Sequence, residues 1–344
     1  MPQKLWEANS QIKSKSNLFE FEKYLAKKFN YIPKKNYKKL YNWTIKNPKL
    51  FWSSIWEFSN VKGIKNDKFY FPKEIIKSKF LLKSKLNYAE NLLSKNDNSK
   101  AVTFISENGY REEKSWKELN KNTLKLINFF KLNKIKKKDR IAAYTANQIE
   151  TVEGFIATSA IGAIWSSCSP DFGTQGVIER FSQIKPKLLI ITDRYYYNGK
   201  EINVLERLPA ILKKIKSIQS VLITNYPGKK NLKQKKIRGI KIFYFNELKH
   251  KVKTNTTFKK FDFDKELAIL YSSGTTGKPK CICHRAGGVL LQHLKEHKLH
   301  CNVKPGDNVF YFTTCGWMMW NWLMTFLASK ASIVLFDGFP MHKR

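Results

Sequence analysis

The sequence predicts an α/β protein with parallel-sheet layers that are covered by helices. From about residue 101, short runs of apolar and β-branched residues alternate with longer segments whose apolar residues recur at helical spacing. Strands separated by helices of this length are typical of a parallel sheet that is buried on both faces. Hydrophobic residues make up 42% of the 344 residues and aromatic residues 14%, so the chain is able to bury a large core.

The first 100 residues are predicted to form a helical N-terminal extension and an irregular segment that leads into the main domain. Leu18, Phe21, Leu25 and Phe29 fall near helical spacing, and four more large aromatic residues follow between 43 and 56. No helical or strand period persists from 61 to 100. We therefore assign 1–100 to the extension and 101–344 to the main domain.

The main domain is predicted to alternate strands and helices. Ser115 begins the first helix, because Glu118 three residues later completes a capping box. The predicted strands are 101–106, 140–144, 163–168, 187–192, 220–224, 241–245, 267–271, 281–284, 308–314 and 331–336. The other predicted helices are 149–160, 177–184, 288–300 and 317–329.

Two stretches, 154–170 and 309–329, resemble membrane-spanning segments in that they contain no charged residue. The second stretch contains several polar residues, and its pattern changes from strand-like at 309–314 to helix-like at 317–329. The sequence therefore predicts a buried strand–loop–helix there and no membrane span.

Lysine dominates a strongly basic composition. The chain has 64 Lys and Arg against 27 Asp and Glu, a formal net charge of +37, and only 8 of the 64 are arginine. Nucleic-acid recognition favours the planar guanidinium group. Because the lysines are scattered through every segment, we favour solvated surface charge, with weak sticking to polyanions, over a specific nucleic-acid site.

The cysteines and the N-terminus indicate a cytoplasmic location. The five cysteines, at 168, 281, 283, 301 and 315, have no disulfide-like spacing. The first 16 residues contain no apolar leader core. Reduced thiols in the cytoplasm are the simple interpretation.

The most specific segment is a glycine- and hydroxyl-rich loop, YSSGTTGKPK, at 271–280. Its glycines allow a tight turn, and its hydroxyl and backbone N–H groups are able to donate to phosphate oxygens. Pro279 stands where a Walker A loop has its Mg²⁺-binding hydroxyl, and a strand follows instead of a helix, so the loop is of another kind. We expect it to join two strands at one edge of a parallel sheet, on the surface.

This loop resembles the nucleotide-phosphate loop of the adenylate-forming superfamily, which includes acyl-CoA synthetases, luciferases and peptide-synthetase adenylation domains. TTCGWMMWNW at 313–322 resembles the acyl-pocket motif of acetoacetyl-CoA synthetases in particular. LWEAN at 5–9, YNWTIKNPKLFW at 41–52 and LNYAENLL at 86–93 resemble the N-terminal part of acetyl- and acetoacetyl-CoA synthetases. The resemblance extends from residue 5 to residue 338.

The resemblance implies an acid–thiol ligase that uses acetoacetate, ATP and CoA, with Mg²⁺ as activating ion; an acetyl- or propionyl-CoA synthetase is the alternative. The residues implied to cradle the β- and γ-phosphates of ATP are Ser272, Ser273, Gly274, Thr275, Thr276, Gly277 and Lys280. The implied acyl-pocket residues are Trp317, Met318 and Met319. The implied CoA contacts are Phe172, Gly173 and Lys200.

The sequence departs from the family's pattern in its length. Members carry a second stretch of similar size, with the adenine- and ribose-binding residues and a C-terminal lid that supplies the catalytic lysine, and the 344 residues show no counterpart. We therefore expect an incomplete large N-terminal domain that is inactive alone. The last predicted strand is expected to leave an open sheet edge after Phe336, which favours aggregation or pairing with a separately encoded second half.

One further pattern suggests a different class of protein, a zinc hydrolase. His293, Glu296 and His297 match H-x-x-E-H on a predicted helix. Five-residue patterns arise by chance in long chains, and the adjacent loop accounts for this region without zinc. We favour an amphipathic helix with solvated histidines, no third ligand and no metal.

Overall fold

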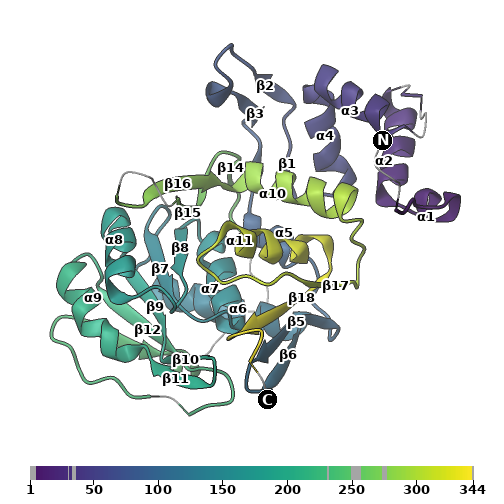
Figure 1. The fold of residues 1–344 in the computed structure, drawn as a ribbon. Coiled ribbons are helices and arrows are strands. Elements are labelled where there is room, and N and C mark those ends of the chain that lie inside the picture. Colours follow the sequence, from purple (N-terminus) through teal and green to yellow (C-terminus); the bar gives the residue numbers. More distant parts are fainter. Residues whose placement is uncertain are drawn as a thin grey trace.

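The structure, a computed structural model, describes residues 5–29, 31–32, 36–230, 232–248, 257–272 and 277–342. Two mixed β-sheets form the framework of the body, with helices between them and on the outer face of the larger one (Figure 1). The predicted α/β class, with sheet layers covered by helices, is confirmed.

The larger sheet contains seven strands in the order β13-β12-β9-β7-β8-β15-β16. Its neighbouring strands are parallel except for the antiparallel β15–β16 pair at one edge. The strands are β7 (Arg140–Tyr144), β8 (Ile164–Cys168), β9 (Leu188–Thr192), β12 (Ser220–Thr224), β13 (Lys241–Tyr244), β15 (Glu266–Ser272) and β16 (Lys280–Arg285). The sequence predicted each of them to within one residue at either end.

The smaller sheet has the strand order β17-β18-β5-β6. Its strands are β5 (Lys100–Ser106), β6 (Arg111–Ser115), β17 (Asn308–Phe310) and β18 (Ser332–Asp337). The predicted open edge after Phe336 is wrong, because β18 pairs in parallel with β17 on one side and with β5 on the other. Among the described strands, the open edges of this sheet are β17 and β6.

Helix α7 (Ile149–Ala160) lies between the two sheets, next to α6 (Trp116–Leu132). Eleven of its twelve residues are buried, as expected of a helix that is covered on all sides. α6 begins with the predicted capping box, in which Ser115 and Glu118 exchange hydrogen bonds between side chain and backbone. α8 (Thr174–Ile184) and α9 (Leu208–Lys214) cover the outer face of the larger sheet (Figure 1).

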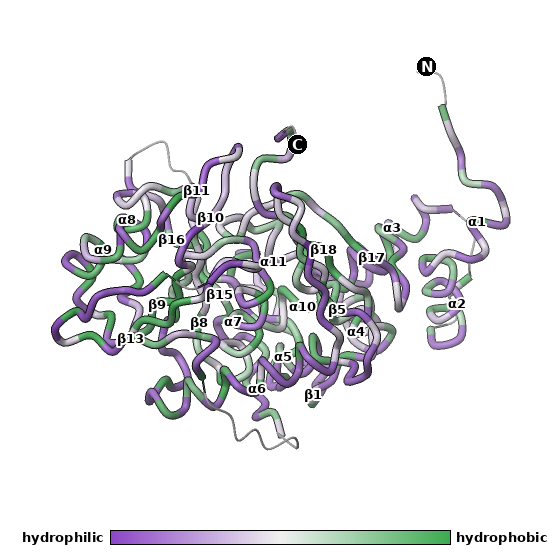
Figure 2. The backbone as a smooth tube through the Cα atoms, turned by 90° about the horizontal axis from the view of Figure 1, so that it is seen from below, coloured by the Kyte–Doolittle hydropathy of each residue, from purple (hydrophilic) through white to green (hydrophobic). Residues whose placement is uncertain are grey.

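The N-terminal extension lies at one end of the molecule (Figure 1). Its helices are α1 (Ser10–Ser14), α2 (Asn17–Phe29), α3 (Tyr37–Lys46) and α4 (Pro48–Phe58). α4 packs against α10 (Ala286–Lys295), and α2 packs against the π-helical turn Glu296–His300 that continues α10. Hydrophobic residues concentrate inside the body, whereas hydrophilic residues cover its outer loops (Figure 2).

Short elements connect the extension to the body. They are β1 (Gly63–Ile64), β2 (Lys68–Tyr70), β3 (Lys79–Leu82), β4 (Lys85–Leu86), α5 (Tyr88–Leu92) and β14 (Phe261–Asp262). A hairpin of β10 (Arg194–Tyr197) and β11 (Lys200–Asn203) extends from the larger sheet.

The uncharged stretch 309–329 forms the predicted strand–loop–helix. The strand is shorter than predicted, because β17 ends at Phe310, and the helix is α11 (Met318–Thr325), continued by the 3₁₀ turn Phe326–Ser329. Across the described ranges, no helix has both the length and the apolar character that a bilayer span requires.

Candidate nucleotide and acid site

The phosphate loop connects β15 to the edge strand β16. Ser272, the last residue of β15, pairs with Lys280, the first residue of β16, so the two ends of the loop lie side by side. Gly277 has a φ of +102°, and Lys278 beside it is exposed. The predicted residues outside the described ranges are Ser273, Gly274, Thr275 and Thr276. The prediction that the loop joins two strands at a sheet edge, on the surface, is confirmed at its described ends.

Helix α8 forms hydrogen bonds to both ends of this loop. Gln183 Nε2 donates to the carbonyl of Pro279 at 2.9 Å. The hydroxyl of Tyr271 donates to the carbonyl of Arg180 at 3.3 Å, and burial raises the pKa of this tyrosine. The guanidinium of Arg180 lies 4.4 Å from the ring centroid of Phe172. No sequence pattern singled out Gln183 or Arg180, because both are ordinary polar positions of an amphipathic helix that only the fold brings to the loop.

A cavity of about 380 Å³ lies between α10 and α11, and we call it the α10–α11 cavity. Met318 and Met319 line it, whereas Trp317 is 62% exposed and is not among the lining residues. The other lining residues are His284, Gly288, Val289, Gln292, His293, Glu296 and Trp322. Apolar walls with a few polar groups are typical of a site for a small organic molecule.

The H-x-x-E-H residues lie on α10 and the turn that continues it, and two of them, His293 and Glu296, line this cavity. The prediction of solvated histidines is wrong, because His293 is only 5% exposed and His297 is fully buried. His293 Nδ1 lies 2.8 Å from Thr325 Oγ1, and the ring of His297 stacks on Phe326 with centroids 3.4 Å apart. Within the described part of the chain, no three His, Cys, Asp or Glu side chains are grouped to hold a metal ion.

Replacing His297 with leucine is expected to make the fold less sensitive to acid. Burial, reinforced by His293 nearby, lowers the pKa of His297 to about 2 from its ordinary value of 6.5. Below pH 6.5 the imidazole of His297 is protonated in the unfolded chain but stays neutral in the folded chain. Its contribution to the free energy of unfolding is therefore complete above pH 6.5 and is lost as the pH falls. The free energy of unfolding of His297→Leu, relative to wild type, should therefore rise by roughly 3 kcal/mol from pH 7 to about pH 4.5.

Urea unfolding of the two chains at both pH values measures this difference. Comparing the chains at the same pH cancels the opposite contributions of Asp337 and Glu153, whose pKa values burial raises to about 7. A difference that stays constant between the two pH values would mean that the pKa of His297 is not lowered by folding.

The residues predicted to contact CoA lie on two loops near the carboxyl ends of the central strands. Phe172 and Gly173 follow β8 and lead into α8, and Lys200 is the exposed first residue of β11. A cavity of about 640 Å³ lies between the neighbouring parts of these loops and the residues after β18. Its lining residues include Ser169, Asp171, Tyr195, Tyr196, Tyr197, Gly338 and Phe339 but none of the three predicted contacts.

The turn of the β10–β11 hairpin is held by a buried carboxylate. Glu107 accepts hydrogen bonds from the backbone N–H groups of Asn198 at 2.9 Å, Gly199 at 2.8 Å and Phe339 at 2.6 Å. Asn198 and Gly199 both have positive φ, as in a two-residue type I′ hairpin. The residue that follows them is Lys200, so its backbone position is fixed by Glu107.

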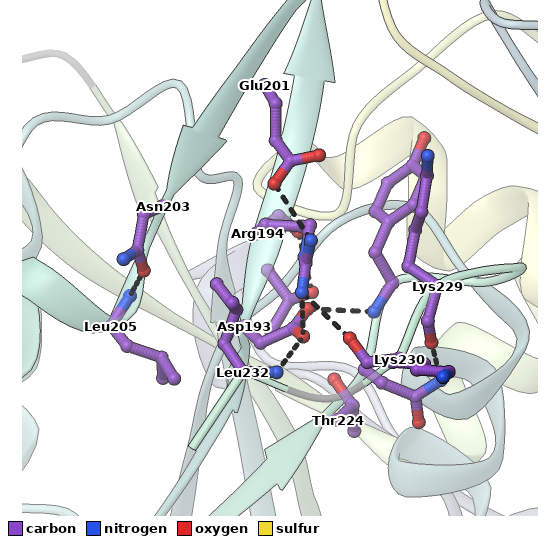
Figure 3. Close-up of polar contacts among 12 residues, drawn as sticks. Asp193, Arg194, Glu201, Asn203, Leu205, Thr224, Lys229, Lys230 and Leu232 are labelled. Atoms are coloured by element: carbon purple, nitrogen blue, oxygen red, sulfur yellow. Dashed lines mark hydrogen bonds and ion pairs between the residues drawn. The ribbon is translucent and has the colours of Figure 1, made fainter. Parts of the chain in front are cut away.

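The base of the same hairpin is held by the Asp193 network (Figure 3). The carboxylate of Asp193 accepts hydrogen bonds from the N–H groups of Tyr226 at 2.8 Å and Leu232 at 3.1 Å, and it lies 3.4 Å from the guanidinium of Arg194. Arg194 also donates to the carboxylate of Glu201 on β11 at 2.8 Å. This network fastens the hairpin to the loop after β12.

Comparison with known proteins identifies relatives. The sequence model described as AMP-binding enzyme matches residues 91–344. The chain is 38% identical to an acetoacetyl-coenzyme A synthetase of Rhizobium meliloti (strain 1021), over 98% of this chain and 51% of that protein. It is 40% identical to an acetoacetyl-CoA synthetase of Gallus gallus, over 89% of this chain and 47% of that protein.

A solved structure, the acetoacetyl-CoA synthetase from Streptomyces lividans, superposes with a TM-score of 0.88 and 29% sequence identity. The match covers 98% of this chain and 52% of that one. The chain thus spans about half the length of the relatives it matches.

Proposed function

Because the chain belongs to the AMP-binding enzyme family, we propose that it provides the phosphate loop and the acid cavity of an acetoacetate–CoA ligase. The observation that carries this proposal is the position of α10. This helix begins directly after β16 and also lines the α10–α11 cavity, so one rigid element joins the phosphate loop to a cavity for the acid.

In the proposed reaction, the carboxylate of the acid attacks the α-phosphate of ATP and pyrophosphate leaves. The thiol of CoA then attacks the acyl carbon, and AMP leaves. Neither step needs a side-chain nucleophile, so the contribution of this chain is position and charge. Lys280 and the donors of the loop would hold the departing pyrophosphate.

The described residues do not by themselves fit a Mg²⁺ site. They contain no group of three His, Cys, Asp or Glu side chains placed to hold a metal ion. The positive charge that these residues offer to the phosphates is that of lysine.

The α10–α11 cavity suits an acid that carries a second polar group. Met318 and Met319 supply apolar wall. Gln292 and His284 supply polar groups, and burial lowers the pKa of His284, which favours a neutral ring that can hydrogen-bond to a ketone. Glu296 also lines the cavity, and its carboxylate accepts hydrogen bonds from Gln292 at 2.8 Å and Trp322 at 3.1 Å. This chemistry favours acetoacetate over acetate or propionate, as do the names of the relatives.

The same proposal gives roles to the predicted CoA contacts, to Trp317 and to the N-terminal extension. Phe172, Gly173 and Lys200 would contact CoA, and Trp317 would stand at the mouth of the acid cavity. The residues 1–100 would act as an extension of a domain that begins at 101. The complete enzyme would act in the cytoplasm, with the other half of the relatives' length supplied by another polypeptide or by a longer chain.

Replacing Lys280 with glutamine is expected to weaken binding of ATP by roughly tenfold or more, because a charge-assisted contact to phosphate is worth about 1.5–3 kcal/mol. Calorimetric titration of the chain at high ionic strength measures this, since salt screens the exposed lysines elsewhere. Lys213→Gln, on α9, changes the net charge equally and should leave the affinity unchanged. Equal losses in both variants, or no loss in either, would refute the role of the loop.

A further inference from the structure

A separate cavity of about 280 Å³ lies where the N-terminal extension meets the body. Its walls come from the end of α4, the π-helical turn after α10, and the 3₁₀ turn Phe326–Ser329 with the residue that follows. We call it the extension cavity. Lys298 in its wall is twelve residues beyond Ala286, the start of α10, so it lies about 18 Å along the helix axis from the end of β16. The extension cavity is therefore distinct from the phosphate loop.

The charges that line the extension cavity are all positive. The lining lysines are Lys62, Lys298 and Lys330, and no aspartate or glutamate lines the cavity. In the described part of the chain, none of the three forms an ion pair with a carboxylate. By contrast, Lys65 is 16% exposed and lies 2.5 Å from Glu57, and Lys114 is 14% exposed and lies 3.5 Å from Glu150. The half-buried Lys298 lacks the counter-ion that these other sheltered lysines have.

Without a bound anion, the charged form of Lys298 is destabilised by its surroundings. Burial lowers its pKa, and the positive charge of Lys330 lowers it further. Its Nζ lies 5.6 Å from the ring centroid of Phe58, a contact that compensates only weakly for lost hydration. An anion between the two ammonium groups would replace their repulsion with two attractions.

Two buried hydroxyls in the same wall have no bonding partner. Ser59 is 8% exposed and Ser329 is 5% exposed, and neither Oγ has a hydrogen-bond partner among the residues that the structure describes. A buried hydroxyl without a partner destabilises the fold. The wall itself is well ordered, since the side chain of Asn17 donates to the carbonyl of Val303 at 2.9 Å and so ties α2 to the body.

We propose that the extension cavity binds a small phosphate anion between Lys298 and Lys330. A multivalent oxyanion accepts hydrogen bonds from ammonium groups, which these walls provide, and no carboxylate lines the cavity to repel it. Because the walls come from both the extension and the body, the anion would fasten one to the other. Its source is either free orthophosphate or the pyrophosphate that the proposed ligase reaction releases.

The test compares the 344-residue chain with a double variant, Lys298→Met with Lys330→Gln, in titrations with orthophosphate and with pyrophosphate at constant ionic strength. Both anions should raise the melting temperature of wild type. The variant should bind orthophosphate roughly tenfold more weakly or worse, because two charge-assisted contacts are lost. Without phosphate, its melting temperature should equal or exceed that of wild type, because the repulsion is gone. The second result distinguishes a lost site from a damaged fold.

Two controls make the outcome specific. Lys213→Gln with Lys214→Gln, on α9, changes the net charge equally and should bind like wild type. Lys278→Gln with Lys280→Gln, in the phosphate loop, should retain orthophosphate binding even if the proposed ligase function is wrong. Orthophosphate binding that is lost in the loop variant and kept in the cavity variant would overturn the proposal, as would equal binding by every variant. In the loop variant, whose loop lysines are replaced, tighter binding of pyrophosphate than of orthophosphate would identify the reaction product as the ligand, and the reverse order would identify free phosphate.

Discussion

Assayed alone for acetoacetate- and ATP-dependent release of AMP, the 344-residue chain is expected to turn over many orders of magnitude more slowly than the roughly one per second of a slow complete enzyme. Its phosphate loop would grip only the β,γ end of ATP, and the chain spans about half the length of its relatives. Precise positioning of reactants is worth roughly 7–11 kcal/mol in favourable cases. If ATP is bound only through its β- and γ-phosphates, its α-phosphate is poorly positioned and most of that gain is lost.

Activity should appear when a polypeptide that covers the other half of the relatives' length is added. Lys280→Gln should then lower it, whereas Lys213→Gln should not. Replacing acetoacetate with acetate or propionate in the same assay should reduce the rate, and a faster reaction with acetate would favour an acetyl-CoA synthetase instead. Turnover near one per second or faster by the 344-residue chain alone would refute the expectation.

Replacing Asp193 with alanine is expected to lower the free energy of unfolding by about 3–5 kcal/mol, the usual cost of removing one partner from a buried ionic network. Asp193 is fully buried, and its carboxylate is the acceptor for the N–H groups of Tyr226 and Leu232. The substitution leaves those donors without an acceptor and leaves Arg194, whose side chain is only 10% exposed, without its buried counter-charge. Urea unfolding of the chain, followed by circular dichroism, measures the loss.

Glu201→Gln is the matched control for the Asp193 network. Glu201 pairs with the same arginine, but its side chain is 42% exposed, so its removal should cost less than about 1 kcal/mol. Losses of similar size for the two variants would show that burial does not set the energetics of this network.

The sequence predicted the larger sheet well because its strands are local patterns. The residues of β9 and β12 form apolar runs that are too short for a helix and rich in β-branched residues. β6 was missed, since its sequence, REEKS, is polar and only partly buried. The β10–β11 hairpin was also missed, although Asn198-Gly199 between two short strands is a strong hairpin signal that could have revealed it.

The strand pairing in the smaller sheet and the environment of the site residues could not be predicted from local sequence patterns. The central place of β18 depends on its pairing with β5, more than two hundred residues earlier, and no local pattern encodes that pairing. The burial of His293 and His297 likewise follows from α11 and the 3₁₀ turn packing over them. Gln183 meets Pro279 only through the arrangement of α8 beside the sheet edge.

Because β18 pairs between β17 and β5, the smaller sheet cannot be completed until late in synthesis of the chain on the ribosome. β5 ends at Ser106 and β18 at Asp337, so 231 further residues must be made after β5 before β18 is complete. At the usual pace of synthesis, this takes roughly 10–50 s. During that time β5, which includes the fully buried Val102 and Phe104, is paired with β6 at most and lacks its other neighbour, β18. We expect the nascent chain to depend on chaperones through this interval, and its yield to fall when they are limiting.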